Sequence, residues 1–419
     1  MNNNGVPPID AFGFARSHVY SYNYFNPNAQ YLPWSRGDGS TYPNSSATAA
    51  RMAPHNNTTY NLTVNLLSQN ANAQFQAHLG MRLPSGMRFR LTGNTNANCG
   101  GLSNGGTNNV REIGASGHTM TATCGMYIEY FPATFYLPID HPLPEGFIEA
   151  NRTTAANACS FTAATGVNRC DMYRYEIKPE NYVGGAGGAA YQAAIRNFAN
   201  WFTYYGTRQN AAIASASHAL ADVNNMRVGY FTINARNNVT MYDMGVASQK
   251  AALFGIGNSA SGTIPATAPG ASTLLGLPAN GGSTPNTSAV NFLGQQFQRV
   301  PGSGERIEDM PIQVACQKNA GMLFTDGFNN DSATPTAPAI NGLGAPFDTT
   351  GANTMAAIAS RYYYNHNTNT VGLPGTSPLR GTTGAGAFAG GRCRYRKRAA
   401  RSRKQVPNGN GWTVRPTCT

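Results

Sequence analysis

The feature that most constrains the fold is an alternation of helical and strand-like segments between residues 187 and 366. Residues 189–223 contain no proline, and their apolar residues recur at steps of mostly three and four, which predicts a helix. Gly206 lies inside this stretch, where a glycine costs about 1 kcal/mol relative to alanine. We therefore expect a break or a bend in the helix at Gly206.

Two more helices and two strands follow along the chain. The pattern predicts helices over 286–300 and 353–366, and buried strands over 227–234 and 319–327. The order helix, strand, helix, strand, helix is typical of a parallel sheet covered by helices. The expected fold class of this part of the chain is therefore α/β, with a parallel sheet flanked by helices.

The part of the chain before residue 187 has a different pattern, in which apolar and polar residues alternate over short runs. These runs are 60–67, 87–93, 125–138 and 173–178. The period of two, with many Tyr, Phe, Ile and Thr residues, predicts antiparallel β-structure with long loops. We therefore divide the chain into an irregular and β-rich region at 1–186, an α/β domain at 187–372 and a tail at 373–419.

Charge is sparse and concentrated in the tail. Charged residues make up 11% of the chain, against roughly 25% in ordinary soluble domains. The net charge is +12, but residues 392–404 hold eight cations and no anion, and the remainder carries 22 cations against 18 anions. The tail has no apolar periodicity, so we expect it to be disordered. A basic surface for nucleic acid is not indicated outside the tail.

The chain has no apolar run of about 18 residues, so the sequence predicts no membrane span. Its poverty in Lys and Glu, together with many Asn, Gly, Thr and Tyr residues, is more typical of a secreted or surface protein than of a cytosolic enzyme.

Seven cysteines are present, and none of them forms a C-x-x-C motif. Cys159 and Cys170 enclose a short polar loop, and Cys99 and Cys124 enclose a Gly/Asn-rich one. Both loops fit local disulfides if the chain is exported. The alternative is that these are free, buried thiols.

Two short motifs are candidates for binding. Asp326 follows the apolar run GMLF and precedes Gly327, so it would lie at the carboxyl end of a parallel strand, where a cation could bind. An aspartate that begins a turn is the plainer reading. Arg36-Gly37-Asp38 lies in a turn-rich loop and could engage an integrin-type receptor, although Asp-Gly is also common turn chemistry.

Patterns of catalysis are missing from the sequence. The histidines are scattered, with no H-x-H or H-E-x-x-H, and there is neither a G-x-S-x-G elbow nor a P-loop. We therefore expect a protein that is not an enzyme.

Several separated blocks of the sequence resemble the PilC/PilY family of type IV pilus biogenesis and tip-adhesin proteins. The most distinctive are NFANWFTYYGTR, RVGYFTIN and ACQKNAGMLFTDGFNND. The resembling blocks, in chain order, are 22–34, 129–138, 197–208, 227–234, 281–299, 315–331 and 345–364.

The resemblance implies a von Willebrand factor A-like domain with a large antiparallel β-rich insertion at its N-terminal side. It implies export through the periplasm to the cell surface or pilus tip, and roles in pilus assembly, twitching motility and attachment. The implied partners are pilus subunits or minor pilins and a host or surface receptor. Thr284 and Asp326 match the threonine and aspartate of that family's metal-dependent adhesion site.

This sequence also departs from the family. It has no D-x-S-x-S motif and no C-terminal propeller, and Gly206 replaces a usual arginine. We therefore expect a fragment or split form whose incomplete site binds Mg²⁺ or Ca²⁺ weakly, with the export signal and the missing motif encoded upstream. The alternative is a secreted binding module whose basic tail contacts polyanions such as DNA or lipopolysaccharide. Contact with nucleic acid is expected only through that tail.

Overall fold

The structure is a computed structural model of the whole chain. The residues that it describes are 10–67, 74–92, 98–105, 109–155, 171–257, 259–270, 273–276, 283–299, 301–302, 304–313, 319–325, 327–334 and 354–364.

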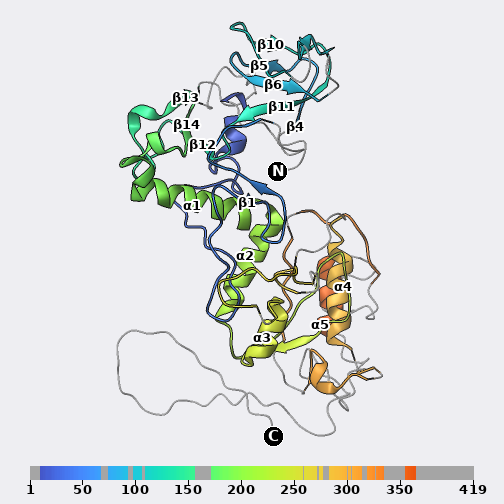
Figure 1. Cartoon of the computed structure of the whole chain (residues 1–419). Helices are drawn as coiled ribbons and strands as arrows, with labels where there is room; N and C mark the ends of the chain where they lie inside the picture. The colour runs from blue at the N-terminus through green and yellow to red at the C-terminus, as the bar shows by residue number, and fades with distance from the viewer. Residues whose placement is uncertain are drawn as a thin grey trace, which may run out of the picture. The chain divides into compact units, whose positions relative to one another are not determined.

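Short strands dominate the first half of the chain, and helices dominate the second half (Figure 1). The strands are β1 (Ala50–Arg51), β2 (Thr59–Tyr60), β3 (Leu66–Leu67), β4 (Gln74–Ala77), β5 (Arg82–Leu83), β6 (Arg88–Leu91), β7 (Asn98–Cys99), β8 (Leu102–Ser103), β9 (Arg111–Glu112), β10 (His118–Thr119), β11 (Cys124–Tyr130), β12 (Thr134–Pro138), β13 (Thr153–Ala155), β14 (Met172–Glu176), β15 (Arg227–Gly229) and β16 (Met241–Asp243). The α-helices are α1 (Ala189–Tyr204), α2 (Arg208–Ala221), α3 (Ala247–Phe254), α4 (Asn286–Phe297) and α5 (Met355–Tyr364). The 3₁₀-helices are η1 (Asp10–Arg16), η3 (Glu149–Asn151), η4 (Pro179–Asn181), η5 (Gly185–Gly187) and η6 (Ile307–Asp309).

The chain forms two compact units. The first contains Met1–Asp222 and Ile256–Pro269, and the second contains Val223–Gly255 and Gly270–Thr419. Helices α1 and α2 therefore belong to the first unit, together with the β-rich half of the chain.

The largest sheet of the first unit is built around β11. On one edge β11 pairs with β6, which in turn pairs with β9, and on its other edge it pairs with both β3 and β4. Every pairing is antiparallel, as the alternating pattern of this region predicted. Cys124, Met126 and Ile128 occupy alternate positions of β11 and are buried, which gives this sheet its own apolar core.

A second, three-stranded sheet has the order β12-β14-β13 and packs with α1. Its core is rich in aromatic residues, and the rings of Phe135 and Tyr175 stack 5.2 Å apart. Helix α1 adds Ile195, Phe198 and Trp201 to this core. These residues follow the helical spacing seen in the sequence, so one face of α1 is buried.

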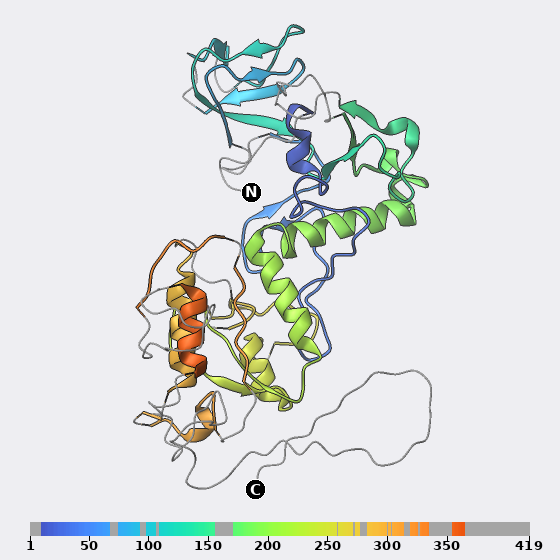
Figure 2. The ribbon, with the colours of Figure 1, turned by 180° about the vertical axis from the view of Figure 1, so that it is seen from behind.

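Helix α1 ends where the sequence predicted a break. Gly206 lies between α1 and α2, and a Cβ atom there would lie 2.6 Å from the carbonyl oxygen of Phe202. Thr207 then caps α2, because its side-chain oxygen accepts a hydrogen bond from the backbone N–H of Asn210. The prediction of a break at Gly206 is confirmed, and the change of direction is visible in Figure 2.

The described residues of the second unit form a two-stranded hairpin, the α-helices α3, α4 and α5, and the 3₁₀-helix η6. Strands β15 and β16 pair antiparallel, and α4 lies beside α5 in both views (Figures 1 and 2). The hydroxyl of Tyr362 in α5 donates a hydrogen bond to Asn291 Oδ1 in α4 over 2.8 Å. The helices expected over 286–300 and 353–366 are thus present as α4 and α5, with ends that differ by a few residues.

The expectation of a parallel sheet flanked by helices, and with it the von Willebrand factor A-like fold, is wrong. Every strand pairing in the described residues is antiparallel. The expected strand at 227–234 forms only β15, and its partner β16 begins at Met241. The connection of residues 230–240 is short for a parallel crossover, which needs a dozen residues or more, and suits an antiparallel hairpin.

The second expected strand of that sheet is also not formed. Residues 319–325 are described but belong to no strand, and the side chains of Met322 and Phe324 are 77% and 68% exposed. The apolar run GMLF therefore does not mark a buried strand here. A continuous apolar run cannot by itself tell a buried strand from an exposed segment, because burial depends on distant parts of the chain.

Among the described residues, no helix is both long and apolar enough to cross a membrane.

Candidate functional site

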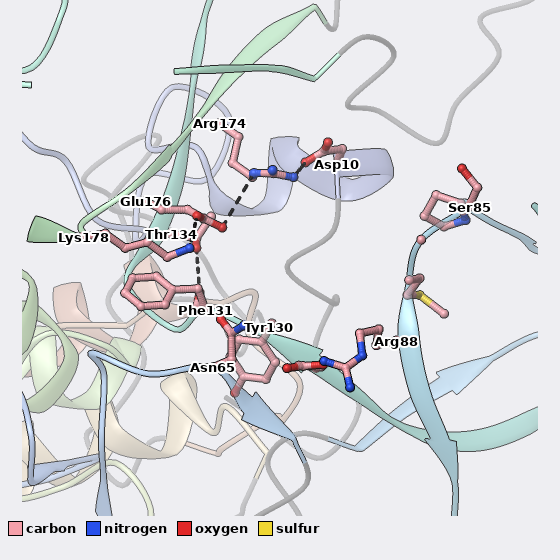
Figure 3. A pocket seen from close by; sticks show the side chains of 14 residues that line it. Asp10, Asn65, Ser85, Arg88, Tyr130, Phe131, Thr134, Arg174, Glu176 and Lys178 are labelled. Atoms are coloured by element: carbon pink, nitrogen blue, oxygen red, sulfur yellow. Dashed lines mark hydrogen bonds and ion pairs between the residues drawn. The ribbon is translucent and has the colours of Figure 1, made fainter. Parts of the chain in front are cut away.

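A polar cavity of about 310 Å³ lies in the first unit, where the ends of its two main sheets approach each other. Figure 3 shows Arg174, Glu176 and Lys178 on one side of this pocket, and Ser85 and Arg88 on the other. The charged side chains of the lining are Asp10, Arg88, Glu129, Arg174, Glu176 and Lys178. They come from η1, β6, β11, β14 and the segment just after β14, so several parts of the fold position them.

One wall of the pocket is a chain of alternating charges. Asp10 Oδ1 lies 2.9 Å from Arg174 Nη1, and Arg174 Nε lies 3.8 Å from Glu176 Oε1. Glu176 Oε2 in turn lies 2.6 Å from Lys178 Nζ. Positions 174, 176 and 178 alternate along one strand and its extension, so their side chains share a face. Tyr175 and Ile177, on the opposite face, are buried in the aromatic core.

The position of Asp10 in this wall is fixed by a second hydrogen bond. The hydroxyl of the buried Tyr136 donates to Asp10 Oδ1 over 2.8 Å. Burial, together with the charge of Asp10, raises the pKa of Tyr136, so the phenol keeps its proton and remains a donor. Burial lowers the pKa of Arg174, but Asp10, Tyr136 and Glu176 together more than offset this, so the net pKa is raised.

The opposite wall carries one ion pair between neighbouring strands. Arg88 Nη1 lies 2.6 Å from Glu129 Oε2, and the two side chains are 52% and 16% exposed. Glu129 Oε2 is buried and makes no bond of hydrogen-bonding geometry.

The base of the pocket is formed by Tyr130 and Phe131, at the point where β11 leads toward β12. Lys178 Nζ lies 4.8 Å from the centre of the Phe131 ring, close enough for a cation–π contact. The hydroxyl of Thr134 donates to the carbonyl oxygen of Phe131 over 2.6 Å. The turn between the strands is thus held from both sides, which keeps the base rigid.

The lining of the pocket is rich in charged side chains. Its lining carries three carboxylates and three cations, and each carboxylate faces a cation. The described lining residues include no cysteine or histidine. The site therefore offers a dense set of hydrogen-bond donors and acceptors on two fixed walls, with aromatic carbon between them.

The tripeptide Arg36-Gly37-Asp38 lies away from the pocket and is partly buried. The side chain of Arg36 is buried and donates to the carbonyl oxygens of Thr263 and Ser259 over 2.5 and 2.7 Å. Asp38 is more exposed and accepts hydrogen bonds from Ser40 in a tight turn. The receptor-binding role of this tripeptide stays a prediction, and it would require Arg36 to leave these partners.

The structure describes only one member of the predicted metal pair. Thr284 is half-buried just before α4, whereas Asp326 lies outside the described residues. A Cβ atom on Gly327 would lie 3.4 Å from Thr284 Oγ1, so the residue after Asp326 lies close to Thr284. The described residues contain no group of three or more His, Cys, Asp or Glu side chains that could hold a metal ion. The weak Mg²⁺ or Ca²⁺ site stays a prediction from the resemblance.

Of the cysteines, Cys99 and Cys124 are joined by a disulfide with a Cα–Cα distance of 5.9 Å. This is one of the two local pairings that the sequence suggested, and it ties β7 to the start of β11. Cys159 and Cys170 lie outside the described residues, as does the basic tail at 373–419.

The sequence analysis did not single out the pocket residues. A signal was present in the run YRYEIK, where Arg174, Glu176 and Lys178 fall at alternate positions. Three charges on one face of a strand are unusual in a chain with only 11% charged residues. The partners Asp10 and Glu129 could not be found in this way, because their contacts depend on the pairing of distant segments.

Comparisons of this chain with known protein families, curated proteins and solved structures find no match. The resemblance to the PilC/PilY family therefore rests on the sequence blocks described above. The residues of the pocket are assigned from geometry alone.

Proposed function

We propose that this chain is a non-enzymatic surface adhesin and pilus biogenesis factor of the PilC/PilY type, as a fragment or split form. The observation that carries the proposal is that the sequence blocks with the resemblance contact one another in space. The proposal does not include the von Willebrand factor A-like fold.

In the first unit, three of these blocks build one aromatic core. Phe25, from block 22–34, has its ring centre 5.0 Å from that of Phe198 in block 197–208. The same ring lies 5.5 Å from Phe135 in block 129–138. A substitution in one block would change the packing of the other two, so the three blocks are constrained together.

Backbone contacts connect the first and third of these blocks as well. The indole N–H of Trp34 donates to the carbonyl oxygen of Tyr204 over 3.0 Å. The backbone N–H of Tyr31 donates to Asn197 Oδ1 over 2.8 Å. These bonds explain why an irregular segment with many Pro, Asn and Gly residues keeps a defined path along α1.

In the second unit, the blocks at 281–299, 315–331 and 345–364 also meet. Asp331 accepts hydrogen bonds from the backbone N–H groups of Thr287 and Ser288 at the start of α4. The hydroxyl of Tyr362 in α5 also donates a hydrogen bond to Asn291 in α4. In both units, the segments that carry the resemblance are thus in contact with one another.

Deletion of the encoding gene in its native organism tests this proposal. We expect the deletion strain to lose surface pili and to form little or no twitching zone, and the intact gene supplied in trans to restore both. A strain that lacks the gene but keeps normal piliation, twitching and attachment would contradict the proposal.

The alternative, a secreted module that binds polyanions through its basic tail, draws on residues 392–404, which lie outside the described residues. It stays a prediction from the sequence. The deletion experiment separates the two, because a polyanion-binding module has no role in pilus assembly.

A further inference from the structure

We infer that the polar pocket of the first unit binds a neutral saccharide, either as a free sugar or as one residue of a glycan chain. This inference rests on the proposed adhesin function for its biological setting, and it names the class of receptor chemistry that such an adhesin would recognise. The argument uses the charge balance of the pocket, its hydrogen-bonding groups, its size and the rigidity of its walls.

Charge balance argues against a charged ligand. The three carboxylates and three cations of the lining are already paired at 2.6 to 2.9 Å, in Arg88–Glu129, Asp10–Arg174 and Glu176–Lys178. An anion would have to draw a cation away from its carboxylate, and a cation would have to do the reverse. Either change leaves one charge of the pair without its partner, which is unfavourable in a partly desolvated site.

Hydrogen-bonding groups argue against an apolar ligand. Both walls present charged oxygen and nitrogen atoms, and Asn65 and Ser85 add neutral polar groups to the lining. Glu129 Oε2 is buried, and Arg88 Nη1 lies 2.6 Å from it. An apolar molecule would cover these groups without satisfying them, which costs more than its own burial provides.

Sugar hydroxyls match the arrangement of these groups. A hydroxyl donates one hydrogen bond and accepts others, so a single hydroxyl can bridge a carboxylate and the cation beside it without separating the pair. The alternating chain from Asp10 to Lys178 offers such sites in sequence along one wall, and Arg88–Glu129 offers another opposite them. Between the walls, the ring of Tyr130 provides apolar carbon for the C–H face of a pyranose.

Size and rigidity fit the same ligand. A volume of about 310 Å³ is at the lower end of the usual range for small-molecule sites, roughly 300–1,000 Å³. Arg88 is 52% exposed, so the pocket is open to solvent on that side and a longer glycan could extend outward. The bonds that hold Asp10 and Thr134 fix the walls before any ligand arrives, which lowers the entropic cost of binding.

The test is saturation-transfer NMR and titration calorimetry of the full chain. The probes are the methyl glycosides of glucose, galactose, mannose and N-acetylglucosamine. Inorganic phosphate, tetramethylammonium and an uncharged capped dipeptide serve as competing classes of ligand. We expect at least one glycoside to bind with a millimolar Kd that changes less than about twofold between 0.05 and 0.5 M NaCl, because a neutral ligand is not screened by salt.

The decisive variant is the double substitution Arg88→Gln and Glu129→Gln, which keeps the net charge and the approximate volume of the pocket. It removes hydrogen bonds to two charged groups, so we expect glycoside binding to weaken about tenfold or more. The matched control is Arg306→Gln with Asp309→Asn. That ion pair, at 3.7 Å, belongs to the second unit and is outside the pocket lining, so the control should leave the affinity unchanged. Lys178→Gln, on the other wall, is a second variant that should also weaken binding.

Three outcomes would overturn the inference. The first is a folded chain that binds none of the glycosides, and the second is glycoside binding that survives both pocket variants. The third is tighter binding of phosphate, the ammonium ion or the dipeptide than of any glycoside. Because piliation is measured separately in the deletion strain, the saccharide inference can fail while the proposed pilus function stands, and the reverse also holds.

Discussion

At the scale of single residues, Arg36 shows how far a side chain's surroundings can differ from what its motif suggests. In the sequence it belongs to an Arg-Gly-Asp tripeptide in a turn. In the structure its guanidinium is buried, donates to two backbone carbonyl oxygens and lies 5.9 Å from the centre of the Tyr42 ring. Those contacts hold the segment 259–263 against the N-terminal part of the first unit, which is a structural role.

Arg36→Gln should therefore destabilise the first unit, and by more than Asp38→Ala, which removes the ion pair to Arg36 at 3.5 Å and the turn bonds from Ser40. Loss of charged hydrogen bonds to two carbonyl oxygens leaves both poorly satisfied, and we expect the free energy of unfolding to fall by about 2 kcal/mol. Tryptophan fluorescence can measure this, because the buried Trp34 and Trp201 both belong to the first unit. Equal stability of the wild type and Arg36→Gln would show that these bonds contribute little. Loss of cell attachment in Asp38→Ala at unchanged stability would instead favour the receptor-binding role.

Asp331 is a second residue whose role depends on a distant contact. Its Oδ1 accepts hydrogen bonds from the backbone N–H and the hydroxyl of Thr287, and its Oδ2 accepts from Ser288. Burial raises the pKa of this carboxyl, but the hydrogen bonds from Ser288 and Thr287 lower it by a larger amount. The net shift of the pKa is therefore downward. The carboxylate thus satisfies amide groups that the first turn of α4 cannot satisfy itself.

We expect this contribution to depend on pH in a defined direction. Because the folded-state pKa is lowered, the stabilisation is fully present above the unfolded value of about 3.9 and is lost as the pH falls through the folded value below it. At neutral pH, Asp331→Asn should lower the opening free energy of α4 by about 1 kcal/mol, the usual value of a helix cap. Hydrogen exchange over 286–297 measures this, with Asp222→Asn in the other unit as control. An α4 whose protection is unchanged by Asp331→Asn at pH 7 would refute the capping role.

At the scale of elements, α4 and α5 show how close two helices can approach. A Cβ atom on Gly294 would lie 2.1 Å from Cδ2 of Tyr362, a separation that real side chains do not adopt. Only glycine lets the ring of Tyr362 pack directly on the backbone of α4. The hydrogen bond from the Tyr362 hydroxyl to Asn291 then fixes the register of the two helices.

Gly294→Ala tests this packing, because the direction of the change in stability depends on whether the two helices are in contact at this position. Alanine normally stabilises a helix interior by about 1 kcal/mol over glycine, but overpacking at this contact should reverse the sign and destabilise the second unit by about 1–3 kcal/mol. Gly302→Ala is the control, because the nearest atom there is the end of the flexible Glu305 side chain at 3.3 Å. Hydrogen exchange of α4 and α5 reports the effect. Increased protection in Gly294→Ala would mean that the two helices do not pack as described.

The elements also show which parts of the fold could be predicted from the sequence. Helices α1, α2, α4 and α5 and the break at Gly206 were predicted, because helical periodicity and capping are local properties of the chain, whereas the short helix α3 was not. The alternating runs correctly located β6, β11, β12 and β14. The pairing at 227–229 and the exposure of 319–325 were missed, because strand pairing and burial depend on residues far away in the sequence. The pocket was missed for the same reason, since Asp10 and Arg174 are 164 residues apart.

At the scale of the whole molecule, the first unit combines the resembling blocks of the aromatic core with a polar pocket on the same fold. The rings of Phe25, Phe135 and Phe198 form the centre of that core. Strand β14 contributes Tyr175 to that core and lines the pocket with Arg174 and Glu176. A rigid scaffold that presents a fixed set of hydrogen-bonding groups is what a surface-binding protein requires.

The most direct test of the central claim is the location of the chain on the pilus. Cells of the native organism would express the protein with an epitope tag, and pili sheared from their surface would be examined by immunogold electron microscopy. We predict that the label co-purifies with the filaments and marks one end of them, with a strain that lacks the major pilus subunit as the negative control. A label found only in the soluble fraction, or equally present in the sheared material of the strain without pili, would contradict the proposed function.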